Sequence, residues 1–324
     1  MTTSAVRQFL AMAAAWVVAA LLPFPVGAAP FAYITNQKDD SVTVIDTASG
    51  TVQATLRVGK EPAGVAVSGN GRRVVVTNAG GKGITVIDGA RQQVLTHLDL
   101  GEGLVGVAVD AEGRLAYVAE WYDNSVSVID LETLSVLRRL PVGHVPAGMV
   151  LSRDGSCLYV ANRDDDTITA LDPNTGRLLA EVRVGKHPFG IALAPDETLL
   201  FSANVESNDV SIVDLKTFQV LANVPVGERP YAVAYVAPYR RLFVTNQYDN
   251  TVSVVDVDRA KAVAEVPVGE YPEGIALHPD GIHLYVANWF DNSVSVINGL
   301  SLKVERTIEA GNGSRAFGAF IAGS

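Results

Sequence analysis

The sequence contains a single cysteine, Cys157, among its 324 residues. One cysteine cannot form a disulfide within the chain. Cys157 directly precedes the apolar stretch Leu158–Ala161, so we expect it to be a small buried hydrophobic side chain rather than a reactive thiol. No cysteine lies near the apolar N-terminal segment, which argues against a lipid anchor there.

Familiar catalytic motifs are missing as well. The chain has no Gly-x-Ser-x-Gly nucleophile elbow, no glycine-rich phosphate loop and no Cys-x-x-Cys-His haem attachment site. These absences favour a binding role over an enzymatic one. Nothing in the sequence requires a cofactor.

Basic residues are in the minority. The chain has 25 Lys and Arg against 35 Asp and Glu, a net charge of −10, and its longest basic runs are the pairs Arg72-Arg73, Arg138-Arg139 and Arg240-Arg241. Non-specific nucleic-acid binding depends on clustered Lys and Arg, and anionic membrane surfaces attract the same residues. Neither is therefore an expected partner.

The first 29 residues differ in character from the rest. Arg7 is their only charge, the apolar run Phe9–Leu22 follows, and the small residues Gly27-Ala28-Ala29 come after two prolines. This pattern predicts a secretory signal peptide cut after Ala28 or Ala29. The alternative is a membrane anchor, for which the run is too short. The predicted location is the bacterial periplasm or the medium, without stable membrane insertion.

A four-residue phrase recurs seven times at steps of 42 residues, at Tyr33–Asn36, Val75–Asn78, Tyr117–Glu120, Tyr159–Asn162, Phe201–Asn204, Phe243–Asn246 and Tyr285–Asn288. No insertion or deletion breaks the period. Stretches of alternating polarity such as Ser125–Asp130 indicate strands, and turn residues such as Pro279-Asp280-Gly281 separate them. A repeat of this length predicts an all-β, seven-bladed β-propeller of four-stranded blades over residues 30–324.

The chain ends predict how the ring closes. The first unit starts at its second strand, and Arg315–Phe320 falls where an innermost strand belongs in the 42-residue frame. We expect this C-terminal stretch to complete the first blade, which removes an open sheet edge.

The repeat unit resembles that of the YVTN (YncE-type) β-propeller family, most clearly in Pro146–Asp172, Arg241–Gly269 and Pro272–Asn298. The resemblance covers nearly all of residues 30–324 and implies the propeller fold. It implies function only loosely, because the family includes surface-layer and periplasmic proteins that are mostly without known enzymatic activity. One YncE-type protein is associated with DNA, which the acidic balance here disfavours. Quinoprotein amine dehydrogenases, the haem d1 domain of nitrite reductase and lactonases have similar blades.

Recurring polar residues are interpreted as scaffold. The Asp46 set is expected to cap turns through its side chains, and the Asn36 set is expected to be structural. Asp-Asn pairs such as Asp123-Asn124 suit turns with positive φ.

Residues that break the repeat mark a candidate binding face, which is formed by the loops after the second strand and between blades. Five aromatic residues lie on these loops: Trp121, Tyr122, Tyr248, Trp289 and Phe290. Aromatic residues on loops are typical of binding sites, although they could also pack between blades as a rim. Arg229, Tyr231, Tyr271 and Arg315 lie on or next to the same loops, and Arg229 and Arg315 could fix an anionic group.

Candidate metal ligands lie around the same channel mouth, at His144, His187, Glu228, Glu270 and Glu273. Histidine with carboxylates suits a divalent metal. No tight His-x-His spacing supports such a site, so each ligand would have to come from a different blade.

The leading functional hypothesis is an exported, monomeric, non-enzymatic propeller that binds a small ligand or a periplasmic protein on its aromatic face. The alternative is an enzyme or accessory subunit of a periplasmic redox or lactone-processing system, with a metal or cofactor near His144 and His187. A third hypothesis, a structural role at the cell surface, would require self-assembly.

Overall fold

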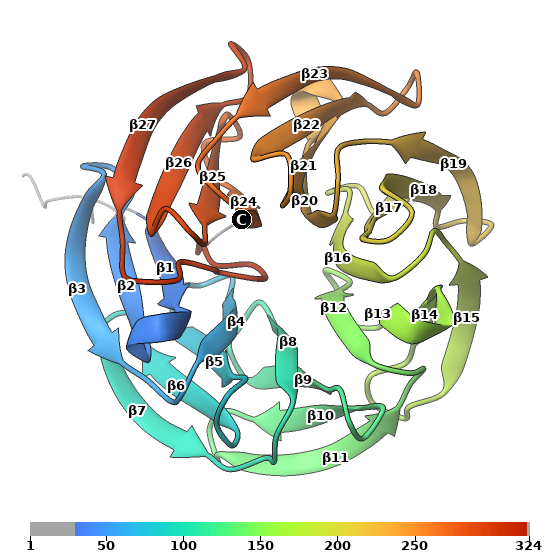
Figure 1. The fold of residues 1–324 in the computed structure, drawn as a ribbon. Helices are drawn as coiled ribbons and strands as arrows, with labels where there is room; N and C mark the ends of the chain where they lie inside the picture. The colour runs from blue at the N-terminus through green and yellow to red at the C-terminus, as the bar shows by residue number, and fades with distance from the viewer. Residues whose placement is uncertain (1–29, 323–324) are drawn as a thin grey trace, which may run out of the picture.

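The computed structural model describes residues 30–322, and the predicted signal peptide lies outside them. Seven antiparallel sheets are arranged as blades around a central axis (Figure 1). Six blades have four strands, and the blade that begins the chain has three. The predicted seven-bladed propeller is therefore confirmed.

The strands follow one another from the axis to the rim within each blade. Blade 1 contains β1 (Phe31–Asn36), β2 (Ser41–Asp46) and β3 (Thr51–Arg57). Blade 2 contains β4 (Pro62–Val67), β5 (Arg73–Asn78), β6 (Ile84–Asp88) and β7 (Gln93–Leu98); blade 3 contains β8 (Leu104–Val109), β9 (Leu115–Glu120), β10 (Ser125–Asp130) and β11 (Ser135–Pro141). Blade 4 contains β12 (Pro146–Leu151), β13 (Leu158–Asn162), β14 (Thr167–Leu171) and β15 (Leu178–Arg183); blade 5 contains β16 (Pro188–Leu193), β17 (Leu199–Asn204), β18 (Asp209–Asp214) and β19 (Gln219–Pro225). Blade 6 contains β20 (Pro230–Val236), β21 (Arg241–Asn246), β22 (Thr251–Asp256) and β23 (Lys261–Pro267); blade 7 contains β24 (Pro272–Leu277), β25 (His283–Asn288), β26 (Ser293–Asn298) and β27 (Lys303–Glu309).

Helical structure in the described residues is limited to the short 3₁₀ turns η1 (Gln37–Asp39), η2 (Arg163–Asp165) and η3 (Ala237–Tyr239). No helix in residues 30–322 has the length and apolar character needed to cross a membrane.

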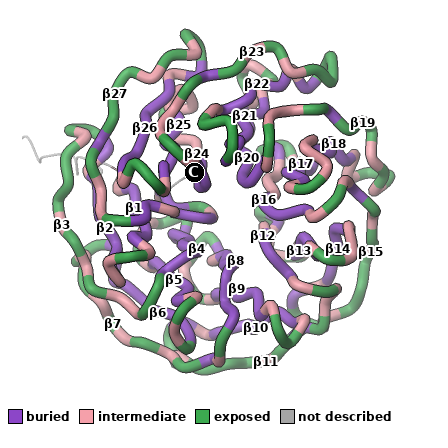
Figure 2. Tube along the Cα trace, viewed as in Figure 1, coloured by how far each residue is buried: buried purple, intermediate pink, exposed green. Residues whose placement is uncertain are grey.

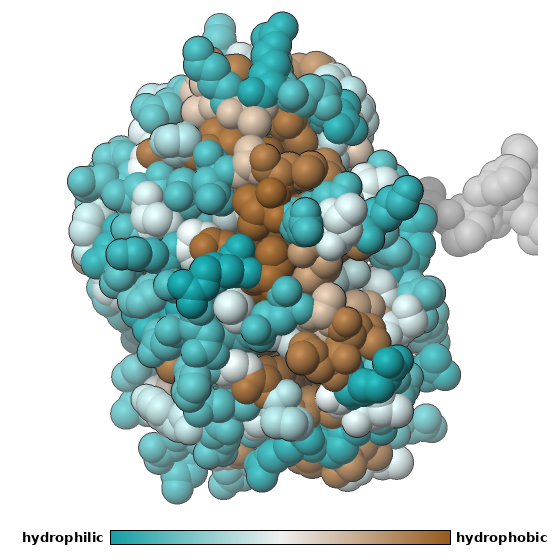
Figure 3. All heavy atoms as spheres, turned by 90° about the vertical axis from the view of Figure 1, so that its right-hand side faces the viewer, coloured by the Kyte–Doolittle hydropathy of each residue, from teal (hydrophilic) through white to brown (hydrophobic). Residues whose placement is uncertain are grey.

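Burial falls from the axis to the rim (Figure 2). The second and third strands are covered on both faces by neighbouring blades, so nearly all of β10 is buried, polar serines included. The outer strands are exposed at many positions, as in β19. On the rim formed by β15 and β19, apolar side chains gather in a band (Figure 3), and Leu221 is 61% exposed.

Glycine in the innermost strands lets the blades meet at the axis. A Cβ atom at Gly106 would overlap the carbonyl oxygen of Ala147, and one at Gly274 would overlap that of Ala316. The same overlap occurs at Gly64, Gly148 and Gly190 with the backbone of the next blade. A glycine therefore recurs two residues after the proline that begins β4, β12, β16 and β24, because backbone packs directly on backbone there.

Threonine and tyrosine of the repeated phrase connect adjacent blades. The Thr77 hydroxyl donates to the carbonyl of Val105 at 2.8 Å, and Thr245 donates to that of Glu273 at 2.9 Å. The Tyr33 hydroxyl donates to the carbonyl of Gly89 at 3.0 Å. These bonds satisfy buried backbone carbonyls between sheets.

The predicted scaffold roles are confirmed. Asp46 Oδ1 accepts from the backbone N–H groups of Ala48 and Ser49 at 2.8 and 3.1 Å, which caps the turn. The Asn36 amide donates to the hydroxyls of Ser41 and Thr43 at 3.0 and 2.9 Å. The second residue of each Asp-Asn pair has positive φ, at Asn124, Asn250 and Asn292.

The C-terminal segment closes the ring as predicted. Tyr33 N donates to the carbonyl of Phe320 at 2.9 Å, and Arg315 N donates to that of Thr35 at 2.8 Å. Bridges pair Ala32 with Ile321 and Asn36 with Ser314 in antiparallel fashion. The segment runs into the centre of the ring, where it also touches β4 (Figure 1).

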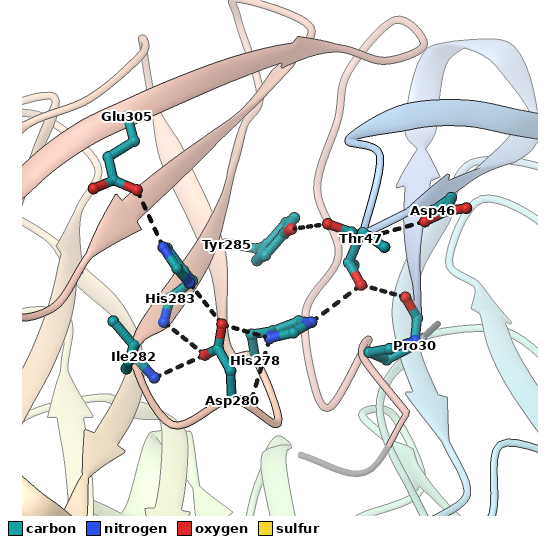
Figure 4. Close-up of polar contacts among 10 residues, drawn as sticks. Pro30, Asp46, Thr47, His278, Asp280, Ile282, His283, Tyr285 and Glu305 are labelled. Atoms are coloured by element: carbon teal, nitrogen blue, oxygen red, sulfur yellow. Dashed lines mark hydrogen bonds and ion pairs between the residues drawn. The ribbon is translucent and has the colours of Figure 1, made fainter. Parts of the chain in front are cut away.

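A histidine network connects blade 7 to blade 1 (Figure 4). It lies on the face of the ring opposite the loops predicted to bind a partner. His278 Nε2 lies 3.1 Å from the Thr47 hydroxyl, and the Tyr285 hydroxyl donates to the Thr47 carbonyl at 3.3 Å. Asp280 Oδ2 lies 3.0 Å from His278 Nδ1 and 2.6 Å from His283 Nδ1. Burial raises the pKa of Asp280, but hydrogen bonds from His283 and the charge of His278 lower it to about 2.

His283 should make the stability of the protein pH-dependent. Burial lowers its pKa, but Asp280 and Glu305, which contact its two ring nitrogens at 2.6 and 3.1 Å, raise it above the ordinary value. Its stabilisation is therefore full below about pH 6.5 and is lost as the pH rises through the folded-state pKa. Thermal melts at increasing pH from about 6.5 should show a falling Tm for the wild type. The Tm of His283→Gln should depend less on pH. His97→Gln, which removes a histidine bound to Thr85, is the control. An unchanged slope in His283→Gln would contradict this origin.

Candidate functional site

The candidate face is built from pairs of loops held together by backbone bonds. The residue after each recurring Asn or Glu donates its N–H to the preceding interblade loop, as from Trp289 to Tyr271 at 3.0 Å and from Trp121 to Gly103 at 3.0 Å. Tyr271 and Arg229 have positive φ, and their N–H groups donate to the side chains of Asn250 and Asn208 at 2.9 and 3.0 Å. The asparagine side chains of these turns therefore hold Tyr271 and Arg229 in place on the face.

Four aromatic rings from blades 6 and 7 form one continuous surface cluster, which we call the aromatic patch: Tyr248, Tyr271, Trp289 and Phe290. The Trp289 and Phe290 centroids are 4.5 Å apart, and those of Tyr271 and Tyr248 are 5.9 Å apart. Tyr271 also meets Phe290 edge-on at 5.2 Å. Tyr248 and Phe290 are 55% and 53% exposed, so the patch is open to a partner.

Two cations flank the aromatic patch. Lys38 Nζ lies 4.0 Å from the Trp289 ring centroid, and the Arg229 guanidinium lies 5.5 Å from that of Tyr248. Trp289 Nε1 donates to Gln37 Oε1 at 2.9 Å. Cations held over aromatic faces add two positive charges to an otherwise apolar surface. Lys38 was not singled out from the sequence. It occupies the same repeat position as Phe290, and ring closure brings blade 1 beside blade 7.

Trp121 and Tyr122 lie on the same type of loop but in blade 3, outside the aromatic patch. Trp121 meets Phe189 edge-on at 6.2 Å, and its Nε1 is buried without a hydrogen-bond partner. Tyr122 is 73% exposed and its ring covers Gly103. The five predicted aromatic residues therefore divide into two groups.

The centre of the face is a buried aromatic stack. Phe189 lies 4.3 Å from Tyr231 and 4.8 Å from Phe317, measured between ring centroids. Phe189 and Tyr231 follow the prolines that begin β16 and β20, where each strand has a register irregularity. Such irregularities redirect side chains, here toward the axis. Phe317 comes from the C-terminal segment, so three parts of the chain close the channel at this face.

A buried ion pair lies beside the stack. Arg315 Nε is 2.5 Å from Glu273 Oε2, the Arg315 guanidinium donates to the Tyr231 hydroxyl at 2.7 Å, and Gln247 donates to Glu273 at 3.0 Å. Burial raises the pKa of Glu273 and the charge of Arg315 opposes this rise. Burial lowers the pKa of Arg315, but Glu273 raises it well above its ordinary value, so the arginine stays charged.

These contacts hold three predicted site residues together, two of them buried. Tyr231 and Glu273 are buried, and both bind Arg315, whose side chain is 19% exposed. Burial also raises the pKa of Tyr231. The contacts among these three residues hold the strands together at the mouth of the channel.

The candidate metal ligands are not brought together: Glu273 lies in β24 and pairs with Arg315, and the other four lie on separate loops. His144 Nδ1 pairs with Asp165 at 2.8 Å, and His187 Nδ1 lies 3.0 Å from Glu206 Oε1. The backbone N–H groups of Glu228 and Glu270 donate to Asp249 and Asp291. Within residues 30–322, no three His, Cys, Asp or Glu side chains are grouped so that they could hold a metal ion.

Comparisons with known proteins agree on the fold. The family model "Lactonase, 7-bladed beta-propeller" matches residues 106–220, which is less than half of the chain. A search of curated proteins finds no significant match.

Solved structures align over most of the chain. Hydrazine synthase of Kuenenia stuttgartiensis is 24% identical with a TM-score of 0.73, covering 82% of this chain and 91% of that one. A protein of unknown function from Desulfotomaculum acetoxidans is 15% identical with a TM-score of 0.74, covering 88% and 99%. The dihydro-haem d1 dehydrogenase NirN, solved in complex with DHE, is 16% identical with a TM-score of 0.66, covering 87% and 64%. At these identities the likeness shows a shared seven-bladed propeller architecture.

Proposed function

We propose that this chain is an exported propeller of the YVTN type that binds a protein partner through the aromatic patch. The observation that carries the proposal is the exposed cluster of Tyr248, Tyr271, Trp289 and Phe290 between Lys38 and Arg229. Aromatic residues and arginine dominate the energetics of protein interfaces.

The shape and charge of the patch favour a protein over a small ligand. Small-molecule sites bury most of the ligand in a concave pocket, whereas Tyr248 and Phe290 are more than half exposed. The flanking cations favour a partner whose apolar contact surface carries an acidic side chain. The chain's own net charge of −10 would repel a strongly acidic partner at long range, so the attraction is local.

A second candidate is an enzyme or accessory subunit of a redox or lactone-processing system. The lactonase family match over residues 106–220 favours it, as does the likeness to hydrazine synthase and to the dihydro-haem d1 dehydrogenase. His144 and His187 lie within the matched segment and would be its candidate site residues.

Patch variants test the proposal. Phe290→Ala and Tyr248→Ala should each weaken partner binding about 30-fold, because each removes an exposed ring worth about 2 kcal/mol at an interface centre. The tagged protein is cross-linked in periplasmic extract of its source cells, the partner is identified by mass spectrometry, and affinities are then measured with the purified pair. Leu221→Ala, which truncates an exposed apolar residue on the rim, should bind like the wild type.

Two outcomes would count against the proposal. One is a partner that binds both patch variants as tightly as the wild type. The other is lactone hydrolysis by the purified protein that disappears in a His144→Ala/His187→Ala variant, which would establish the second candidate.

A further inference from the structure

One cavity of the described chain lies away from the candidate face. It lies inside the central channel beneath Phe317, has a volume of about 390 Å³, and is lined mainly by β12, β16, β20 and β24. It reaches Arg153, Pro195 and Glu197 in the turns after β12 and β16, so it opens on the opposite face.

The cavity wall is apolar and is not covered by the rest of the chain. Met149, Leu151, Ile191, Leu193 and Leu277 line it from three blades, and the Phe317 ring forms its inner end. Leu151, Ile191 and Leu193 are partly exposed. Their repeat counterparts Val65 and Val67 are buried, because the C-terminal segment lies against β4. The uncovered blades thus leave apolar side chains facing an open space.

The same wall offers hydrogen-bond donors. In β4, the N–H groups of Val65 and Val67 donate to the carbonyls of Phe317 and Ala319, both at 2.8 Å. Ile191 and Leu193 of β16 hold the same repeat positions and also line the cavity, on a blade that the C-terminal segment does not pair with. Their N–H groups therefore face the channel and remain available to a ligand.

The mouth of the cavity carries a guanidinium. Arg153 Nη2 donates to the Pro195 carbonyl at 3.0 Å, which positions the group and leaves most of its five N–H donors for a ligand. Glu197 Oε1 accepts from the backbone N–H of Arg153 at 2.5 Å, so that carboxylate is held against the main chain. The wall therefore offers backbone N–H donors, and Arg153 adds a positive charge at the mouth.

We propose that the channel binds a small monocarboxylate with an apolar body, such as a medium-chain alkanoate. The carboxylate would meet Arg153 at the mouth, and the chain would extend along Leu151 and Leu193 toward Phe317. The volume suits this size, since it is well over twice the ~150 Å³ of an engineered cavity that holds benzene. It also falls within the range of natural ligand pockets. The proposal does not depend on the aromatic patch, which lies on the other face.

Calorimetric titration of the full mature protein with decanoate, decanol and decylammonium tests the proposal. Decanoate should bind most tightly. Arg153→Gln should weaken decanoate binding at least tenfold and leave decanol unchanged, because it removes the charge and keeps the apolar wall. Leu193→Trp should abolish binding of both by filling the cavity. Phe290→Ala, in the aromatic patch, should have no effect.

Leu193→Trp could unfold the protein, so Ala319→Trp provides a second block at an exposed position of the cavity lining. Decanoate binding that survives both tryptophan variants would overturn the site. Decylammonium binding as tightly as decanoate, or no binding of any of the three probes, would overturn the assigned chemistry.

Discussion

A chain that ends at Gly311 should lose the single cooperative unfolding transition of the full-length protein. The truncation removes the backbone bonds from Phe320 and Arg315 to β1 and those from Phe317 and Ala319 to β4. It also removes Phe320 and Ile321, which are fully buried in the core between blades 7, 1 and 2. Burying such side chains contributes about 1.5–3 kcal/mol each, and a domain is stable by only about 5–15 kcal/mol.

Calorimetry and urea unfolding would show the effect as an early, broad or multiphasic transition. Blades 1 and 7 should lose amide-exchange protection first, because an open sheet edge and an exposed core would remain there. A chain ending at Ala322 keeps all of these contacts and is the matched control. If the Gly311 truncation melts like this control, the C-terminal segment does not close the ring energetically.

Arg315→Met should destabilise the protein by about 3–5 kcal/mol. The substitution leaves Glu273 buried without its cation, and removing one partner of a buried ion pair has a cost of this size. It also removes the bond to the Tyr231 hydroxyl. Urea unfolding at pH 7 measures the loss. Since burial already raises the pKa of Glu273, the variant should regain stability as the pH falls and the carboxyl takes up a proton.

The double variant Arg315→Met/Glu273→Gln separates charge from packing. It should recover a substantial part of the lost free energy, because the uncompensated charge is gone while Gln247 keeps a hydrogen-bond partner. A double variant no more stable than Arg315→Met would show that packing of the arginine, and not the charge of Glu273, sets the loss.

The repeat predicts the fold because each blade obeys the same local rules. Asp46 and its counterparts hold turns, Asn36 and its counterparts join loop to strand, and an unbroken 42-residue period leaves one arrangement of seven sheets. Closure by Arg315–Phe320 was predictable for the same reason.

The site was less predictable. The repeat shows which residues occupy equivalent positions in different blades, but the distance between two such residues in space depends on how far they lie from the axis. Near the axis, counterparts in adjacent blades touch, which is why Glu273 meets Arg315 and Phe189 meets Tyr231. That pairing could have been found by comparing residues 42 apart. Trp121 and Trp289 share a repeat position, but their blades are not adjacent, so the two rings join different clusters.

The channel cavity could not be predicted from the repeated sequence pattern. It results from an asymmetry, since one C-terminal segment lies against β4 and leaves β12 and β16 uncovered. A pattern shared by all seven units cannot reveal a space that depends on a segment present only once.

Because of the glycines in the innermost strands, the contacts that build the ring are made by backbone, and the side chains of those strands are left to line the channel. Backbone packed against backbone at Gly64, Gly106 and Gly274 sets the spacing at the axis, so side chains elsewhere on those strands do not determine the size of the ring. Natural variation at positions such as Leu151 and Leu193 can therefore change the interior without changing the number of blades. The same scaffold is free to evolve a different chemical preference in its channel, one residue at a time, while the architecture stays constant.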